Sequence, residues 1–350
     1  MEPSHANQPK ARERLSGYAS LILVAGVIAG GALAALSAEY IFRAVPTDIS
    51  RIGIVLDALD DENLQPDIVA FGNSVAMASF DGRILNTALP GNPKVLNLAT
   101  TGQSTVESYL FYQELPKSVT QIVQFIDPVA VTKMVQINPQ KYNAFYMLGY
   151  RPDNRTRAML TEIFEEPMQS LLNKPEITHI FESRWAVKQA ADFIGRSFFR
   201  QDLQLDRRHN DLEYPATGAS RLPDRLLERA IKRRYDTDLK SSFRFTEKKR
   251  GLLTEMTNRA KNDGREIVLV LSPAHPAAYI YAKEGYYAKA REALSEFGQE
   301  NNVTIIDALD IVPGELYSDG VHPMDEGAKL VSNHLASKLA GLLQTSEPRN

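Results

Sequence analysis

Short, almost wholly apolar runs recur along the chain after residue 65, and stretches with helical spacing of apolar positions follow most of them. The runs are rich in Val and Ile and show little polar alternation, which is typical of strands buried on both faces. The predicted strands are residues 68–71, 95–99, 122–126, 267–271 and 303–306, and the predicted helices are residues 104–115, 276–299 and 324–343. Because strands and helices alternate, the pattern predicts an α/β fold. We expect a doubly wound, mostly parallel five-stranded sheet with helices on both faces.

A long segment without strand character separates the third and fourth predicted strands. It adds about 140 residues where an ordinary crossover needs far fewer. Residues 129–264 have the composition of helices and irregular loops, with arginines and acidic residues interleaved. Such a charge mixture usually marks solvated helix faces. The segment is therefore predicted to be a helical insertion, and a role as a cap or partner-docking element stays open.

The N-terminal part of the chain has a different pattern. No charged residue occurs from Leu15 to Ala38, and a helix of that length spans about 36 Å, enough to cross the hydrocarbon core of a bilayer. Lys10, Arg12 and Arg14 precede it, so the positive-inside rule keeps the first residues in the cytoplasm. We expect an uncleaved single-pass anchor in the inner membrane. A cleaved signal peptide is the alternative, although its apolar region is usually shorter.

The predicted organisation follows from these patterns. It comprises a cytoplasmic N-terminus (1–14), a transmembrane anchor (15–42), an extracytoplasmic or periplasmic α/β domain (43–343) carrying the insertion 129–264, and a polar tail (344–350). The net charge of -3 gives no basic surplus of the kind that nucleic-acid binders show. The chain has no cysteine, which excludes disulfide frameworks and thiolate metal sites. No cofactor and no metal are expected.

Candidate chemistry lies where the predicted strands end, because ligands of open α/β sheets bind outside the carboxyl ends of the strands. Gly72-Asn73-Ser74 follows the first strand, and the glycine permits a sharp turn. Ser74 then begins the next helical stretch, where free backbone N–H groups can stabilise an anion. Gly102 follows the second strand in the same way, and its N–H is a candidate oxyanion donor. Alone, each signal is typical of helix caps and turns.

The third strand-end signal is an Asp-x-x-His pair, Asp319 and His322, which comes after the fifth strand and just before the last helix. In a turn, this spacing lets the carboxylate reach Nδ1–H of the imidazole while Nε2 points into the cleft. A general base that takes a proton from a serine needs this orientation. Ser74, His322 and Asp319 together therefore predict a catalytic triad.

These three signals resemble the sequence blocks of the SGNH, or GDSL-like, hydrolase superfamily. Gly72-Asn73-Ser74 matches the nucleophile block, residues 97–102 match the glycine block, and residues 319–323 match the Asp-x-x-His block. The resemblance covers roughly residues 65–128 and 265–343. It implies a serine nucleophile and an oxyanion hole formed by the N–H groups of Ser74 and Gly102. The chain departs from the family in carrying Gly-Asn-Ser for Gly-Asp-Ser. It also ends the third strand in Phe125-Ile126-Asp127-Pro128, which lacks the asparagine that usually supplies a third oxyanion donor.

With an N-terminal anchor, the pattern resembles the cell-envelope branch of the superfamily, which includes alginate O-acetylation proteins and the D-alanylation protein of teichoic acid synthesis. The resemblance implies acyl transfer to, or removal from, an envelope polysaccharide. It also implies a membrane-bound O-acyltransferase as partner. A catalytically weak, membrane-tethered binding or assembly factor is the alternative. A plain periplasmic esterase acting on small or lipid esters is a third interpretation.

Two further residues near the expected cleft are candidates for substrate binding. His275 lies just beyond the fourth strand and can bind substrate or replace the missing oxyanion donor; the alternative is a loop histidine held by the backbone. Asp127 ends the third strand and can orient substrate, although Asp-Pro is also a common turn starter.

Overall fold

The computed structural model describes residues 18–33, 40, 48–132, 139–175, 178, 188, 191, 195, 211–216 and 221–346. At its centre is a five-stranded sheet in the order β2-β1-β3-β4-β5, in which every neighbouring pair is parallel. The strands are β1 (Ile68–Phe71), β2 (Val95–Asn97), β3 (Gln121–Ile126), β4 (Glu266–Leu271) and β5 (Thr304–Asp307). The sequence prediction of a doubly wound parallel sheet is confirmed. In this strand order the connections reverse direction between β1 and β3, and the cleft at that switch point is where such folds bind ligands.

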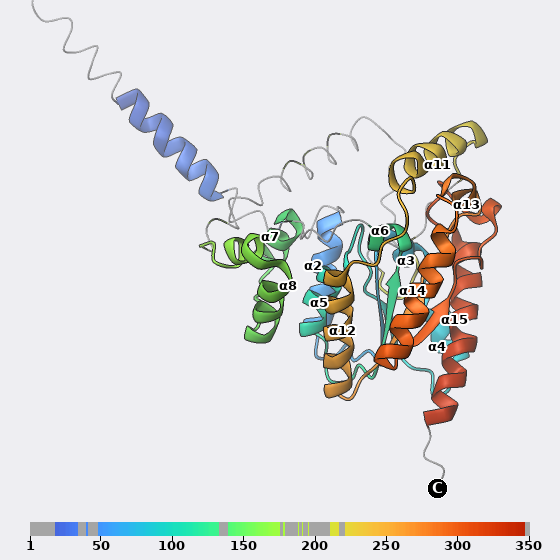
Figure 1. Cartoon of the computed structure of the whole chain (residues 1–350). Helices are drawn as coiled ribbons and strands as arrows, with labels where there is room; N and C mark the ends of the chain where they lie inside the picture. Colours follow the sequence, from blue (N-terminus) through green and yellow to red (C-terminus); the bar gives the residue numbers. More distant parts are fainter. Residues whose placement is uncertain are drawn as a thin grey trace, which may run out of the picture.

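Helices cover both faces of the sheet (Figure 1). One face carries α2 (Asp48–Asp60), α5 (Thr105–Gln113), α12 (Glu247–Asn262) and α14 (Tyr286–Asn301), and the other carries α3 (Ser74–Ser79), α4 (Gly82–Ala88) and α15 (Asp325–Ser346). Side chains along each strand point alternately to the two faces. Val69 and Phe71 of β1 therefore join the first core, whereas Ile68 and Ala70 join the second.

Two of the three predicted helices differ from the structure by more than two residues. The single helix predicted over residues 276–299 is wrong: the structure has α13 (Ala277–Tyr281) and then α14, separated by a short turn. Gly285 before α14 has a φ of 73°, a left-handed conformation that interrupts a helix. The last helix, α15, runs to Ser346 and so takes up the start of the predicted tail, whose residues 347–350 lie outside the described part of the chain.

The described parts of the long insertion consist of helices joined by irregular segments. Within the described residues of 129–264 there is no strand, and the helices are α6 (Pro128–Thr132), α7 (Pro139–Met147), α8 (Asn154–Leu172), α11 (Asp224–Asp238) and α12. Helix α12 packs on β4 and α5, so it is a layer helix of the sheet. A short described segment, residues 211–216, lies along the edge strand β2, where the N–H of Asn97 donates to the C=O of Leu212 at 2.6 Å.

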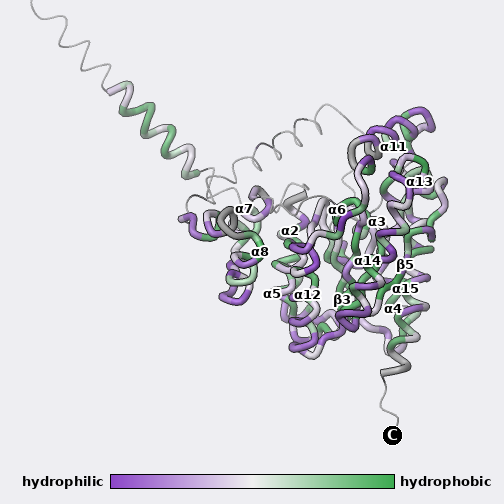
Figure 2. The backbone as a smooth tube through the Cα atoms, in the orientation of Figure 1, coloured by the Kyte–Doolittle hydropathy of each residue, from purple (hydrophilic) through white to green (hydrophobic). Residues whose placement is uncertain are grey.

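Near the N-terminus, residues 18–33 form a helix whose large apolar side chains are exposed, as at Ile22 (72%) and Val27 (69%). Figure 2 colours most of this helix as hydrophobic. Among the described residues, none of the helices has both the length and the apolar character needed to cross a bilayer. The predicted cytoplasmic residues 1–14 and most of the remaining predicted anchor lie outside the described residues, so the anchor stays a prediction.

Candidate active site

A tight turn between β1 and α3 presents Ser74. Gly72 has a φ of 154°, and a Cβ at this position would lie 2.5 Å from Cβ of Ala76 and 2.8 Å from Cβ of Phe125. Only glycine fits there. Asn73 then caps α3, because its Oδ1 accepts the N–H of Val75 at 2.9 Å. Ser74 follows as the first helical residue, half-buried, with its side chain at the carboxyl edge of the sheet.

The loop between β5 and α15 fixes the orientation of Asp319 and His322. Asp319 Oδ1 accepts the N–H groups of Val321 (3.0 Å) and His322 (2.9 Å), which closes a tight turn. The N–H of Ser318 donates to the C=O of His322 at 2.9 Å and ties the two ends of the loop together. Gly320 has a φ of 81°, and a Cβ there would lie 2.3 Å from Cγ1 of Ile231 in α11. The insertion helix α11 therefore packs directly on this loop.

Three predicted residues come together as one hydrogen-bonded chain. His322 Nε2 lies 2.8 Å from Ser74 Oγ, although the two residues are 248 positions apart, and His322 Nδ1 lies 2.7 Å from Asp319 Oδ2. With the proton of the imidazole held on Nδ1 by the carboxylate, Nε2 accepts the hydroxyl proton of Ser74. This is the arrangement that general-base activation of a serine requires.

The carboxylate of Asp319 stays ionised in this arrangement. Partial burial raises its pKa. The hydrogen bond and charge of His322, with the N–H groups of His322 and Val321, outweigh that effect and hold the pKa at about 2. An ionised Asp319 can stabilise the imidazolium that forms when His322 takes a proton.

The glycine loop after β2 adjoins the nucleophile turn. The N–H of Thr100 donates to the C=O of Gly72 at 3.2 Å, and Gln103 Oε1 accepts the same N–H at 2.8 Å. Gly102 is exposed, with a φ of 60°. Neither its N–H nor that of Ser74 donates to an acceptor within the described residues. Both predicted oxyanion donors are therefore available to a ligand.

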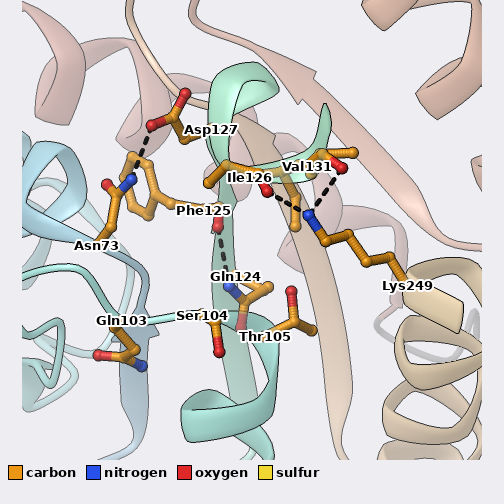
Figure 3. Close-up of a pocket in the computed structure, with 11 residues that line it drawn as sticks. Asn73, Gln103, Ser104, Thr105, Gln124, Phe125, Ile126, Asp127, Val131 and Lys249 are labelled. Atoms are coloured by element: carbon orange, nitrogen blue, oxygen red, sulfur yellow. Dashed lines mark hydrogen bonds between the residues drawn. The ribbon is translucent and has the colours of Figure 1, made fainter. Parts of the chain in front are cut away.

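Asp127 at the end of β3 is tied to the nucleophile turn rather than pointing freely into a cleft. Its Oδ2 accepts the side-chain N–H of Asn73 at 2.8 Å (Figure 3), and its Oδ1 accepts the N–H of Val129 at 2.9 Å. In both of these bonds the carboxyl group of Asp127 is the acceptor. It therefore cannot replace the asparagine donor that the SGNH pattern would place on this strand. The side chain of Asn73 thus links the ends of β1 and β3, the strands on either side of the switch point.

A small cavity of about 80 Å³ lies beside this Asn73–Asp127 pair (Figure 3). Its lining includes Gln124 and Lys249 but neither Ser74 nor His322, so it neighbours the reactive hydroxyl without containing it. Lys249 is buried, and its ammonium donates to the C=O groups of Ala130 and of Val131 (2.7 Å). It thereby satisfies carbonyl groups of α6 and holds this helix against α12.

Two buried polar residues support the site: Arg51, which the sequence did not mark as a candidate, and Asn97, the first residue of the segment that resembles the glycine block. Arg51 in α2 donates through Nε to the C=O of Ala99 (2.7 Å) and through Nη2 to the C=O of Asn97 (2.9 Å). Burial lowers the pKa of Arg51 to about 10, while the charge of Asp211 acts in the opposite direction. The side chain of Asn97 donates to the C=O groups of Met77 (3.1 Å) and Phe80 (2.9 Å). The end of β2 is thus fixed to α2 and to the end of α3.

His275 is not part of the hydrogen-bonded chain. Its Nδ1 accepts the N–H of Ala277 at 3.0 Å, and its ring packs edge-on against Tyr317 with centroids 4.9 Å apart. It is buried, which lowers its pKa, and it makes no hydrogen bond to the Ser74–His322–Asp319 chain. These contacts fit the alternative of a loop histidine held by the backbone, which leaves substrate binding by His275 a prediction.

The described residues contain no group of three or more His, Asp or Glu side chains able to hold a metal ion. No protein-family model matches the chain, and no curated protein matches it in sequence.

Proposed function

We propose that this protein is a serine-dependent enzyme of the SGNH type that transfers or hydrolyses acyl esters. The observation that carries the proposal is the hydrogen-bonded chain from Ser74 Oγ through His322 to Asp319, with distances of 2.8 and 2.7 Å. It lies at the carboxyl edge of a sheet with the 2-1-3-4-5 strand order, where this fold class binds ligands.

The reaction begins when Ser74 Oγ attacks the ester carbonyl carbon while His322 Nε2 takes the hydroxyl proton. The carbonyl oxygen becomes an oxyanion, which the N–H groups of Ser74 and Gly102 stabilise. The tetrahedral intermediate collapses to an acyl-serine, and the imidazolium of His322 returns its proton to the departing alcohol. Water, or the hydroxyl of an acceptor, then resolves the acyl-enzyme by the same steps in reverse order.

The substrate class and location rest on the resemblance and on the N-terminal sequence. We infer an envelope polysaccharide as acyl acceptor or donor, with a membrane-bound O-acyltransferase as partner. The enzyme would be tethered to the inner membrane through residues 15–42, with its α/β domain in the periplasm or outside the cell. The basic residues before the apolar stretch and the exposed apolar side chains of residues 18–33 support the tether.

One specific observation favours a second candidate, a membrane-tethered assembly or binding factor with little catalytic power. Asp127 occupies the strand end where the SGNH pattern places an oxyanion-donating asparagine. The loss of one such donor commonly raises the barrier by about 3 kcal/mol. With this difference we expect either a slow enzyme or a catalytically inactive protein. A plain periplasmic esterase shares the proposed chemistry and differs only in its substrate.

Kinetics with an acetyl ester test the proposal. We expect Ser74→Ala and His322→Ala each to lower kcat by about 10³-fold or more, because each removes a group that the acyl transfer requires. Ser118→Ala is the matched control: its hydroxyl donates to the C=O of Pro66, just before β1 and away from the carboxyl edge, and should leave kcat unchanged. Turnover retained in a folded Ser74→Ala protein would exclude this mechanism.

A further inference from the structure

The insertion brings a lysine to the glycine loop of the site. Lys141 lies in α7, and its Nζ donates to the C=O of Thr101 at 2.7 Å. A Cβ built on Gly102 would lie 3.5 Å from the same nitrogen, so the ammonium stands next to the residue whose N–H is the second oxyanion donor. This contact joins positions 40 residues apart and connects the insertion to the proposed catalytic apparatus.

The contact with Lys141 acts on a single peptide unit, the one that joins Thr101 to Gly102. The C=O of Thr101 and the N–H of Gly102 belong to the same planar peptide, which is trans, so the two groups point in opposite directions. An ammonium that holds the carbonyl therefore fixes the direction of the N–H. The charge-assisted hydrogen bond also draws electron density toward the carbonyl oxygen, which makes the N–H a stronger donor.

The helix that carries Lys141 is firmly packed. Its Tyr142, Ala144 and Phe145 are buried, and the ring of Phe145 lies 4.7 Å from the ring of Phe111 in α5, the helix that follows the glycine loop. Helix α7 also packs against α2, which carries Arg51. These contacts hold the backbone of Lys141 in place. From this fixed position its side chain reaches the C=O of Thr101.

We propose that Lys141 is a positioning residue for the oxyanion hole, which it serves by orienting and polarising the Thr101–Gly102 peptide. This inference rests on the proposed function. It accounts for how a site with Asp127 where an asparagine donor would be expected can still stabilise an oxyanion. The charge of Lys141 in the insertion would then provide part of the oxyanion stabilisation. An asparagine side chain at the end of β3 would otherwise provide it.

Steady-state hydrolysis of p-nitrophenyl acetate by the full chain tests the inference. Methionine matches the length of lysine without its charge, so Lys141→Met should lower kcat about tenfold, less than the loss of a direct oxyanion donor, and leave KM within about twofold. Lys141→Arg keeps a cationic donor and should recover most of the lost kcat. Lys289→Met removes an exposed lysine of α14 and should behave as the wild type.

The outcomes separate this inference from the proposed function. If the wild-type protein neither turns over the ester nor reacts at Ser74 with a fluorophosphonate, both fall together. If the wild type is active and a folded Lys141→Met protein keeps its full kcat, the inference alone is wrong. A rise in KM at constant kcat would also contradict it, because that pattern indicates lost substrate binding. Should Lys141→Met melt below the assay temperature, the Lys141→Arg protein decides: a tenfold loss of kcat in that folded variant contradicts the inference.

Discussion

At the scale of single residues, both carboxylate oxygens of Asp319 are engaged in hydrogen bonds. One oxygen receives two backbone N–H groups and the other receives Nδ1 of His322. These bonds are stronger to the ionised carboxylate than to the neutral acid, and for that reason the pKa of Asp319 falls to about 2 from an ordinary value of 3.8. The same contacts that orient the imidazole therefore also contribute to folding stability.

This pKa predicts how stability changes in acid. A carboxyl group whose pKa is lower in the folded state contributes stability above its unfolded pKa and loses it as pH falls through the folded pKa. For Asp319 the contribution is present above about pH 4 and is lost toward pH 2. Its side chain is 38% exposed, so solvent screening moderates the effect.

The measurement is the melting temperature of the wild type and of Asp319→Asn between pH 5 and pH 2. We expect the wild type to lose stability more steeply than the variant below pH 4, because asparagine cannot titrate. Parallel curves for the two proteins would show that Asp319 is not held by the contacts described.

At the scale of elements, the turn between β1 and α3 depends on a glycine. Gly72→Ala should lower the free energy of unfolding by about 3 kcal/mol, since the new Cβ would overlap Ala76 and Phe125 in a strained backbone conformation. Gly91→Ala is the matched control: it has a φ of 81° but nothing within 4 Å of a new Cβ, so only about 1 kcal/mol is expected. Denaturant unfolding measures both, and equal losses would contradict the packing described for Gly72.

How far the sequence predicts each element depends on whether its signal is local. The strands are runs of Val and Ile, and the structure reproduces them within two residues at each end. Ser74, Asp319 and His322 were predictable because each follows a strand at the same edge of the sheet. Gly285 broke a predicted helix because a left-handed glycine can interrupt a continuous helical pattern.

The contacts that support the site could not be predicted from the neighbouring sequence. Arg51 donates to backbone carbonyls 46 and 48 residues away, and Lys141 donates to one that is 40 residues away. No residue near either of them in the sequence marks it as functional. The pairing of Asn73 with Asp127 likewise depends on the neighbouring positions of β1 and β3. The apolar spacing of Ile52, Val55 and Leu59 is the one signal that would have revealed α2 as a packed helix.

At the scale of the whole molecule, the insertion contributes on two sides of the site. Helix α7 reaches the glycine loop through Lys141, and α11 packs on the Asp-x-x-His loop through Ile231. The N–H of Leu222, just before α11, also donates to the C=O of Ser318 at 2.8 Å. The two loops that carry Gly102 and His322 are thus both supported from outside the sheet.

The proposed membrane tether can be tested with the full-length protein. We expect the full-length protein to stay in the membrane fraction after alkaline washing, and Val24→Lys to lower that fraction. A lysine near the middle of a spanning helix costs about 3 kcal/mol. Complete release of the unchanged full-length chain by the washing step would contradict the anchor.

The most direct test of the central claim is covalent labelling by a fluorophosphonate, followed by mass spectrometry of the modified peptide. The hydrogen-bonded chain from Asp319 through His322 predicts one label per molecule, located on Ser74 and lost in His322→Ala. Under conditions that label a control esterase fully, an unlabelled wild-type protein, or a label on a different serine, would contradict an activated nucleophile at this position.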